Sequence, residues 1–560
     1  MEKVLLSKSS GSLTQWLDTW ALRGMRLLLL LGLIFFLLFP LLAIFGKVAE
    51  QSHWLAVTFE LLGSAHFFQL LQNSFLVSIM TVVLVIPLAG LFAWGIERTC
   101  MPGKKIFRAI SLLPLMAPSM LSAIAMIYLF GNQGILKNWF PEGIYGVNGI
   151  VLGQVFYNFP TALMILLSAM RLSDARLYDA AHSMGASNLK IFLTVTWPAM
   201  RYGVFAASCL VFTQTITNFG IPVIIGGDYP VLAVEAYKSV VGQQQFSYGA
   251  LIGSLLMFPA ILSFLVDILM RRIQKKQAGS YNVPLVPVRQ WRRDMFFFCL
   301  SGFIAIGLLG MIGIAVCASF ITFWPYNLSL SLVHYQFDIS GGMGWRAWCN
   351  SLILASSTAL VGTPVIFFVA WLMEKTRTDV WIDMLLRLCC MLPMAVPGLV
   401  MGLGYVFFFN NGDNPVNGLY GGLALMTICC IVRFLTTAQL TATTALQQLS
   451  KDIEAASLSL NIPLVKTFWC ISVPVCLPAI LDIFRFLFVS AMTSVSALIF
   501  LYNPDTLLAS VTVLNMDDAG NVAGAAALSS LILLTSSGVS LLLAAASHQL
   551  VLRASHWRSV

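Results

Sequence analysis

Twelve separate runs of mostly apolar residues constrain the fold of this chain more than any other feature. A helical run of about 20 such residues crosses the hydrocarbon core of a bilayer. Only 10% of the 560 residues are charged, against about 25% in an ordinary soluble domain. The sequence therefore predicts an all-α polytopic membrane protein with about 12 transmembrane helices. The runs cover residues 26–45, 74–96, 109–131, 148–170, 203–225, 249–270, 295–320, 351–373, 388–409, 418–437, 478–501 and 524–547.

The second half of the chain repeats the first. Asn73, Thr81, Pro87, Trp94 and Glu97 recur as Asn350, Thr358, Pro364, Trp371 and Glu374. We infer two homologous six-helix halves, residues 1–270 and 295–560, joined by a basic, proline-containing linker at 271–294. Because each half has an even number of runs, the halves are expected to be parallel and related by an axis along the membrane normal.

Lysine and arginine predict the orientation. With the amino terminus inside, the outside loops hold only Lys47, Lys137, Lys238 and Arg346 of the 32 Lys and Arg residues. Basic residues next to spans stay on the cytoplasmic side, so both termini are predicted to be cytoplasmic. This bias accounts for the net charge of +9 without a nucleic-acid partner.

Each half carries one copy of a loop motif on the predicted cytoplasmic side, at residues 172–201 and 446–476. The two copies share an acidic residue followed by two alanines, a turn residue and a proline. Glycine and asparagine adopt left-handed backbone conformations at the least cost, so a turn between two short helices is expected. The motif residues are Asp179, Ala180, Ala181, Gly185 and Pro198 in the first copy, and Glu454, Ala455, Ala456, Asn461 and Pro474 in the second.

This pattern resembles the cytoplasmic EAA loop of permease subunits in ABC importers served by a binding protein. The resemblance implies a type I ABC importer permease fold in the bacterial inner membrane, with each loop docking one of two ATPase subunits. The second copy departs from the family pattern, since Asn461 replaces the usual glycine and Ala455 occupies the usual acidic position. The alternative is that both loops are ordinary helix-loop-helix connections held by Pro198 and Pro474.

The chain contains no Gly-x-x-x-x-Gly-Lys-Ser/Thr phosphate loop. ATP and Mg²⁺ are therefore expected on the separate ATPase, and no cofactor or metal on this chain, which would be a transport subunit and not an enzyme. Substrate capture is expected from a periplasmic solute-binding protein, which would dock on the outer loops near 46–72, 321–349 and 502–523.

Residues 218–246 and 495–520 are similar to 2-aminoethylphosphonate permeases, within a branch of importers that also carries ferric iron and thiamine. This resemblance implies 2-aminoethylphosphonate as cargo, with ferric iron or a sugar phosphate as alternatives. An ion-coupled secondary transporter is a more distant alternative, because it leaves the paired loops unexplained.

Polar residues recur at helical spacing within the fifth run and in the corresponding part of the eleventh. They either line a polar path for the cargo or bridge packed helices by hydrogen bonds. The residues are Thr213, Gln214, Thr217 and Asn218, and Thr493, Ser494 and Ser496.

Arg433 stands within an apolar run and has two interpretations. In the first interpretation, Arg433 faces a water-filled path, where its guanidinium would suit a phosphonate. Alternatively, it lies near the cytoplasmic end and snorkels there, or pairs with Asp452 or Glu454.

Overall fold

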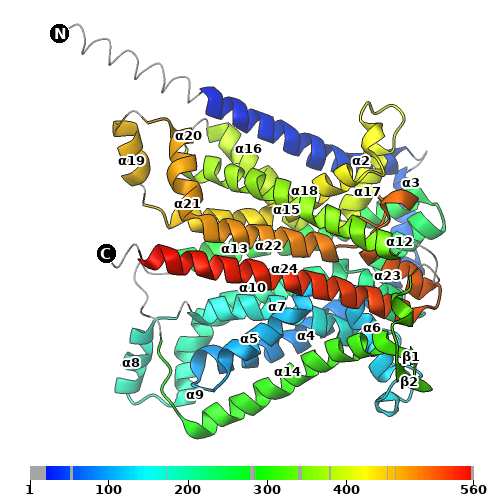
Figure 1. The fold of residues 1–560 in the computed structure, drawn as a ribbon, viewed down its shortest axis with the longest axis horizontal. Helices are drawn as coiled ribbons and strands as arrows, with labels where there is room; N and C mark the ends of the chain where they lie inside the picture. Colours follow the sequence, from blue (N-terminus) through cyan, green and yellow to red (C-terminus); the bar gives the residue numbers. More distant parts are fainter. Residues whose placement is uncertain are drawn as a thin grey trace. The chain divides into compact units, whose positions relative to one another are not determined.

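The computed structural model is almost entirely helical (Figure 1). Among the residues that it describes, nine helices are long and apolar enough to cross a membrane, and three bent helix pairs bring the number of candidate spans to as many as 12. The predicted all-α membrane fold with about 12 transmembrane helices is therefore confirmed. The described residues are 20–50, 54–171, 173–277, 283, 285–337, 344–376, 380–450, 452–460 and 462–556.

Contacts divide the chain into two compact units. Unit 1 contains residues 1–46, 346–508 and 534–560, and unit 2 contains residues 47–345 and 509–533. The first helical stretch of each half thus belongs to the unit that holds the core of the other half. The boundaries predicted from the repeat describe sequence similarity and stay a prediction.

Unit 2 is built around α4, α7 and α10, which pack against one another, with α13 against α10. Helix α14 packs against α4, α5 and α6, and leads into the antiparallel pair β1–β2. The helices and strands are α3 (Trp54–Gly63), α4 (Ala65–Arg98), α5 (Lys104–Leu112), α6 (Ser119–Phe130), α7 (Val147–Arg171), α8 (Ala175–Ser183), α9 (Asn188–Ile191), α10 (Trp197–Thr217), α11 (Gly220–Ile225), α12 (Leu232–Tyr237), α13 (Phe246–Gln277), α14 (Trp291–Phe320), β1 (Ile321–Phe323), β2 (Asn327–Leu330) and α23 (Ala509–Asp518).

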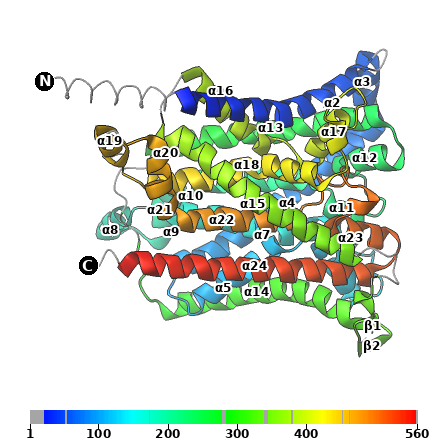
Figure 2. The ribbon, with the colours of Figure 1, turned by 45° about the horizontal axis from the view of Figure 1, so that its top comes forward.

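Unit 1 contains the core of the second half, in which α18 packs against α22. Its α19 and α20 lie at the opposite end of the unit from α17 (Figure 2). Its elements are α2 (Phe39–Ala49), α15 (Gly344–Lys375), α16 (Val380–Met391), α17 (Gly398–Phe409), α18 (Leu423–Gln447), α19 (Asp452–Ser459), α20 (Leu464–Thr467), α21 (Val473–Val475) and α22 (Leu477–Thr493). Three elements cross the division, since α2 ends in unit 2, α15 begins in unit 2, and α24 (Val522–His556) is shared.

The helix at residues 20–46 is held in unit 1 by a buried cation. Arg26 is fully buried, forms an ion pair with Asp383 of α16, and donates to the carbonyl oxygens of Leu372 at 2.6 Å and Thr376 at 2.8 Å. A buried charge is stable only when it is paired and hydrogen-bonded. These contacts attach the start of the chain to residues about 350 positions away.

Several predicted spans are not continuous helices. The helices on either side of Ala117 are bent by 103°, and those on either side of Val396 by 112°. Each of these residues is extended and precedes a proline, Pro118 or Pro397, because proline disfavours the helical conformation in the residue before it. The apolar runs at 109–131 and 388–409 are therefore not single continuous helices, which corrects the expectation of one helix for each run. The run expected at 203–225 likewise breaks at Asn218, where the backbone is extended.

Candidate functional site

The first loop, residues 173–198, folds as two short helices around a turn at Gly185. Asp174 caps α8 by accepting a hydrogen bond from the backbone N–H of Arg176 at 3.1 Å. Gly185 has φ +68° and lies between α8 and α9. A residue other than glycine is strained at this angle. The structure has the turn that was predicted at this position.

The first loop has its own small core. Tyr178, Ala181 and Ile191 are buried together, and the Tyr178 hydroxyl lies 3.0 Å from the Thr196 hydroxyl. Asp179 and Ala180 are exposed on the opposite face of α8. Of the predicted docking residues, Ala181 therefore packs within the loop, whereas Asp179 and Ala180 are accessible to a partner.

In the second loop, residues 452–460 and 462–474 repeat a backbone hydrogen bond of the first. Ile462 N donates to Ser457 O at 2.9 Å, as Ala186 N donates to Ala181 O at 3.0 Å. Ala455 and Ala456 are exposed. Asn461 and the side chain of Glu454 lie outside the described residues.

An exposed apolar residue precedes the turn in both loops. Met184 is 79% exposed and Leu460 is 71% exposed. They stand at equivalent positions, since each donates its N–H to the carbonyl of the alanine four residues earlier, Ala180 or Ala456. Sequence reasoning missed this pair, although an apolar residue directly before each turn position was a signal for it.

Pro198 and Pro474 occupy equivalent places. Each lies in the first turn of a helix, α10 or α21, and each follows a five-residue π-helical turn, Phe192–Thr196 or Phe468–Ser472. Proline has no N–H to donate to the preceding turn, and π turns frequently occur at functional sites. Both loops thus join the long helices through the same irregular turn.

The predicted polar stripe of the fifth run divides into two groups. Thr213 and Thr217 donate to carbonyls of their own helix, at 2.8 Å each, and the Gln214 side-chain oxygen is buried without a partner among the described residues. Asn218 ends α10, and its amide lies 3.4 Å from the side-chain oxygen of Gln154.

Gln154 belongs to a buried network in α7 that sequence reasoning missed. Asn158 is fully buried and donates to the side-chain oxygens of Gln154 at 3.1 Å and Thr215 at 3.3 Å. The signal available in the sequence was the spacing of Gln154 and Asn158, four residues apart within an apolar run. In unit 2 the break at Asn218 is therefore surrounded by neutral amides.

In unit 1 the equivalent break carries a cation. Ser494 ends α22, and its hydroxyl accepts a hydrogen bond from Arg433 at 2.9 Å. A Cβ placed on Gly398 would overlap both the guanidinium of Arg433 and the hydroxyl of Ser496. Thr493 instead donates to Val489 O of its own helix at 2.9 Å. Arg433, Ser494 and Ser496 are thus brought together.

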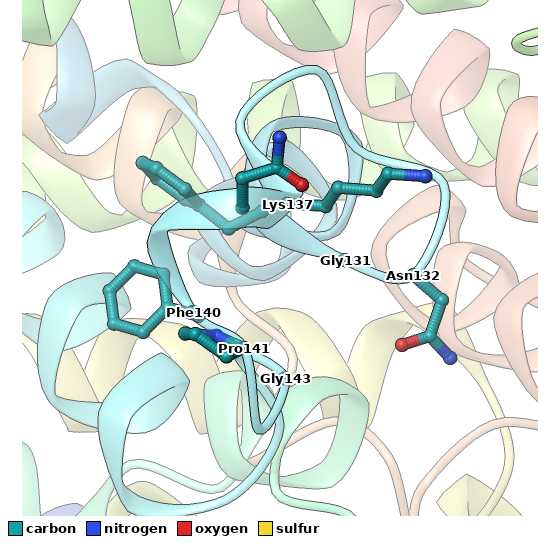
Figure 3. Close-up of a pocket in the computed structure, with 8 residues that line it drawn as sticks. Gly131, Asn132, Lys137, Phe140, Pro141 and Gly143 are labelled. Carbon is teal, nitrogen blue, oxygen red and sulfur yellow. The ribbon is translucent and has the colours of Figure 1, made fainter.

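Among the described residues, no three His, Cys, Asp or Glu side chains are grouped to hold a metal. A hollow of about 360 Å³ opens in the connection between α6 and α7, lined by Phe130, Gly131, Asn132, Lys137, Asn138, Phe140, Pro141 and Gly143 (Figure 3).

The end of α23 carries two neighbouring carboxylates. Burial and the adjacent Asp518 raise the pKa of Asp517 to about 6. Burial also raises the pKa of Asp518, against the effect of Lys238. A carboxyl group with a pKa near 6 is partly protonated in mildly acidic solution, so this pair carries less than two full negative charges there.

Two stretches of the chain, residues 101–279 and 362–551, match the family of binding-protein-dependent transport system inner membrane components. The chain belongs to this family. Each matched stretch contains one of the two loops, and the resemblance to ABC importer permeases is confirmed. The permease is a multi-pass inner membrane protein and a transport subunit, not a catalyst. Its family implies a solute-binding protein and an ATPase as partners.

The permease resembles proteins named for different cargoes. It is 26% identical over 537 residues to the ferric transport system permease protein FbpB of Actinobacillus pleuropneumoniae, covering 91% of this chain and 76% of that protein. It is 26% identical over 503 residues to the putative ferric transport system permease protein FbpB 1 of Haemophilus influenzae, covering 86% and 78%. It is 23% identical over 268 residues to the sulfate transport system permease protein CysW of Synechocystis, covering 46% and 93%.

Proposed function

We propose that this permease is the membrane subunit of an ATP-driven importer in which each of its two loops docks one copy of an ATPase subunit. The observation that carries this proposal is the matched geometry of the loops, with equivalent backbone hydrogen bonds and equivalent exposed apolar residues, Met184 and Leu460. Exposed alanines beside them, Ala180 and Ala456, permit close approach of a partner. ATP and Mg²⁺ would bind to the ATPase subunits, and this chain would need no cofactor.

We further propose 2-aminoethylphosphonate as the cargo. The two stretches similar to phosphonate permeases begin at the breaks that follow α10 and α22, namely at Asn218 and at Val495. Polar side chains lie at both breaks, Asn218 in unit 2 and Ser494 in unit 1. In unit 1 the guanidinium of Arg433 contacts the break. A guanidinium suits a phosphonate group.

Ferric iron is the second candidate, favoured by the two relatives that cover 91% and 86% of this chain. A relative of comparable identity is named for sulfate transport. Identity near 25% therefore does not by itself select one cargo.

The test is to titrate the co-purified binding protein with 2-aminoethylphosphonate, ferric ion and a hexose phosphate by calorimetry. ATP-dependent uptake of the same solutes is then measured in vesicles that contain the permease and its ATPase. We expect binding and uptake of the phosphonate alone. Uptake of ferric ion alone would show that the cargo is ferric iron and not the phosphonate, and would leave the permease assignment unchanged. Uptake without ATP would contradict the ATP-driven mechanism.

A further inference from the structure

Arg433 stands midway along a candidate membrane span. It is the eleventh residue of α18, a helix of 25 residues, which places it roughly 15 Å from one helix end and 21 Å from the other. A cation at such a depth is costly and usually faces a functional cavity or a partner. Of the two interpretations of Arg433, this position favours the one in which it faces a path within the membrane.

Three chain segments of unit 1 converge on the guanidinium. Arg433 comes from α18, Ser494 and Ser496 from the break after α22, and Gly398 from the first residue of α17. The close approach of the guanidinium requires glycine at position 398, because any Cβ would overlap it. The arginine, the two hydroxyls and the glycine therefore form one arrangement.

The first half provides an internal comparison. Helices α7 and α18 are both 25 residues long, and the residues that end α10 and α22 are Asn218 and Ser494, at the same offset of 276 as the two helices. At that offset Tyr157 corresponds to Arg433. The second half thus has a cation at a position where the first half has a neutral side chain.

We propose that Arg433, Ser494 and Ser496 form an oxyanion subsite that receives the phosphonate or phosphate group of the cargo during transport. A guanidinium can donate two parallel hydrogen bonds to such a group, and serine hydroxyls can donate further ones. The interaction is stronger inside the membrane than in water because the local dielectric constant is low. This inference rests on the proposed import function and narrows its cargo to an oxyanion, or to a metal ion accompanied by one.

Direct binding tests the subsite separately from transport. The purified permease–ATPase complex is titrated in detergent with 2-aminoethylphosphonate, with inorganic phosphate, and with ethanolamine, which lacks the oxyanion group. We expect the wild-type complex to bind at least one of the two oxyanions and not ethanolamine. Binding of neither oxyanion, or equal binding of ethanolamine, would overturn the proposal.

Four variants identify the residue responsible. Arg433→Gln removes the charge and is expected to weaken oxyanion binding about 10- to 100-fold, the effect of losing a charge-assisted hydrogen-bond donor. Arg433→Lys keeps the charge but loses the two parallel donors, so it should bind oxyanions more weakly than the wild type and more tightly than Arg433→Gln. Gly398→Ala keeps the arginine but displaces its guanidinium, so it should also weaken binding. Arg485→Gln is the matched control, because Arg485 is another cation of unit 1, paired with Asp482 at 3.0 Å.

The outcomes separate the subsite from the cargo. If Arg433→Gln and the wild-type complex bind oxyanions equally, or if Arg485→Gln has the same effect as Arg433→Gln, the subsite is wrong. Co-purification of the ATPase with each variant confirms that the complex is assembled. If phosphate binding depends on Arg433 while vesicles import no 2-aminoethylphosphonate, the subsite stands and only the proposed cargo fails.

Discussion

At the scale of a single residue, Gly185 allows the backbone turn between the two short helices of the first loop. Its φ of +68° is strained for most side chains, yet a Cβ built there meets no atom within 4 Å. Backbone conformation, and not space, therefore selects glycine at this position. A substitution can disturb the turn without disturbing the packing around it.

Replacing Gly185 with Val should destabilise this turn by roughly 1–2 kcal/mol, because a β-branched residue disfavours the left-handed conformation. We expect loss of one of the two proposed ATPase subunits, measured by the mass of the purified complex. Gly185→Asn is the matched control, since asparagine tolerates this conformation and occupies the equivalent position 461. A full complement of ATPase in the Val variant would contradict docking through this loop.

At the scale of elements, the linker supports the first loop. The linker between the halves packs on the first loop, where Val283 O accepts a hydrogen bond from Ala175 N at 2.9 Å. Leu285 packs against the small core formed by Tyr178, Ala181 and Ile191. The linker thus contributes both a hydrogen bond and an apolar side chain to α8 and its surroundings.

Replacing Leu285 with Ser should loosen α8, because it removes apolar contact from the core of the first loop. Hydrogen exchange measured by mass spectrometry should become faster in peptides that contain Ala175 to Ser183. Peptides from α19 serve as the control within the same molecule and should keep their exchange rate. Equal acceleration in both loops, or in neither, would show that the linker does not support the first loop specifically.

At the scale of the whole molecule, each compact unit combines the core helices of one half of the sequence with the first helical stretch of the other half. Residues 20–46 belong to unit 1, together with residues 346–508, and α14 belongs to unit 2, together with the core of the first half. Arg26 illustrates the consequence, because its ion-pair partner Asp383 lies in the other half of the sequence. Neither half can therefore complete its packing alone.

A chain cut between residues 280 and 281 tests this exchange. Each half expressed alone should be unstable, because half 1–280 lacks α14 and half 281–560 lacks the helix that carries Arg26. Co-expression of the two halves should restore a single species in size-exclusion chromatography and resistance to proteolysis. A stable, protease-resistant half on its own would contradict the exchange as a requirement for folding.

Properties that depend on local chemistry could be predicted from the amino-acid sequence. Apolar runs of about 20 residues select a bilayer as solvent, and the repeated loop motif was readable within a short window of sequence, down to the turn at Gly185. The prolines at 118 and 397 were visible as well, although their consequence, a bend of more than 100° in each pair, was not predicted.

Properties that depend on contacts between distant residues became visible only in the folded protein. Ala181 is buried in the core of its own loop, Arg26 forms an ion pair with Asp383, and Arg433 donates a hydrogen bond to Ser494, 61 positions away. The hydrophobic effect has no direction, so an apolar pattern shows which residues are buried but not against what. Which polar groups meet was set by the packing of helices far apart in the sequence.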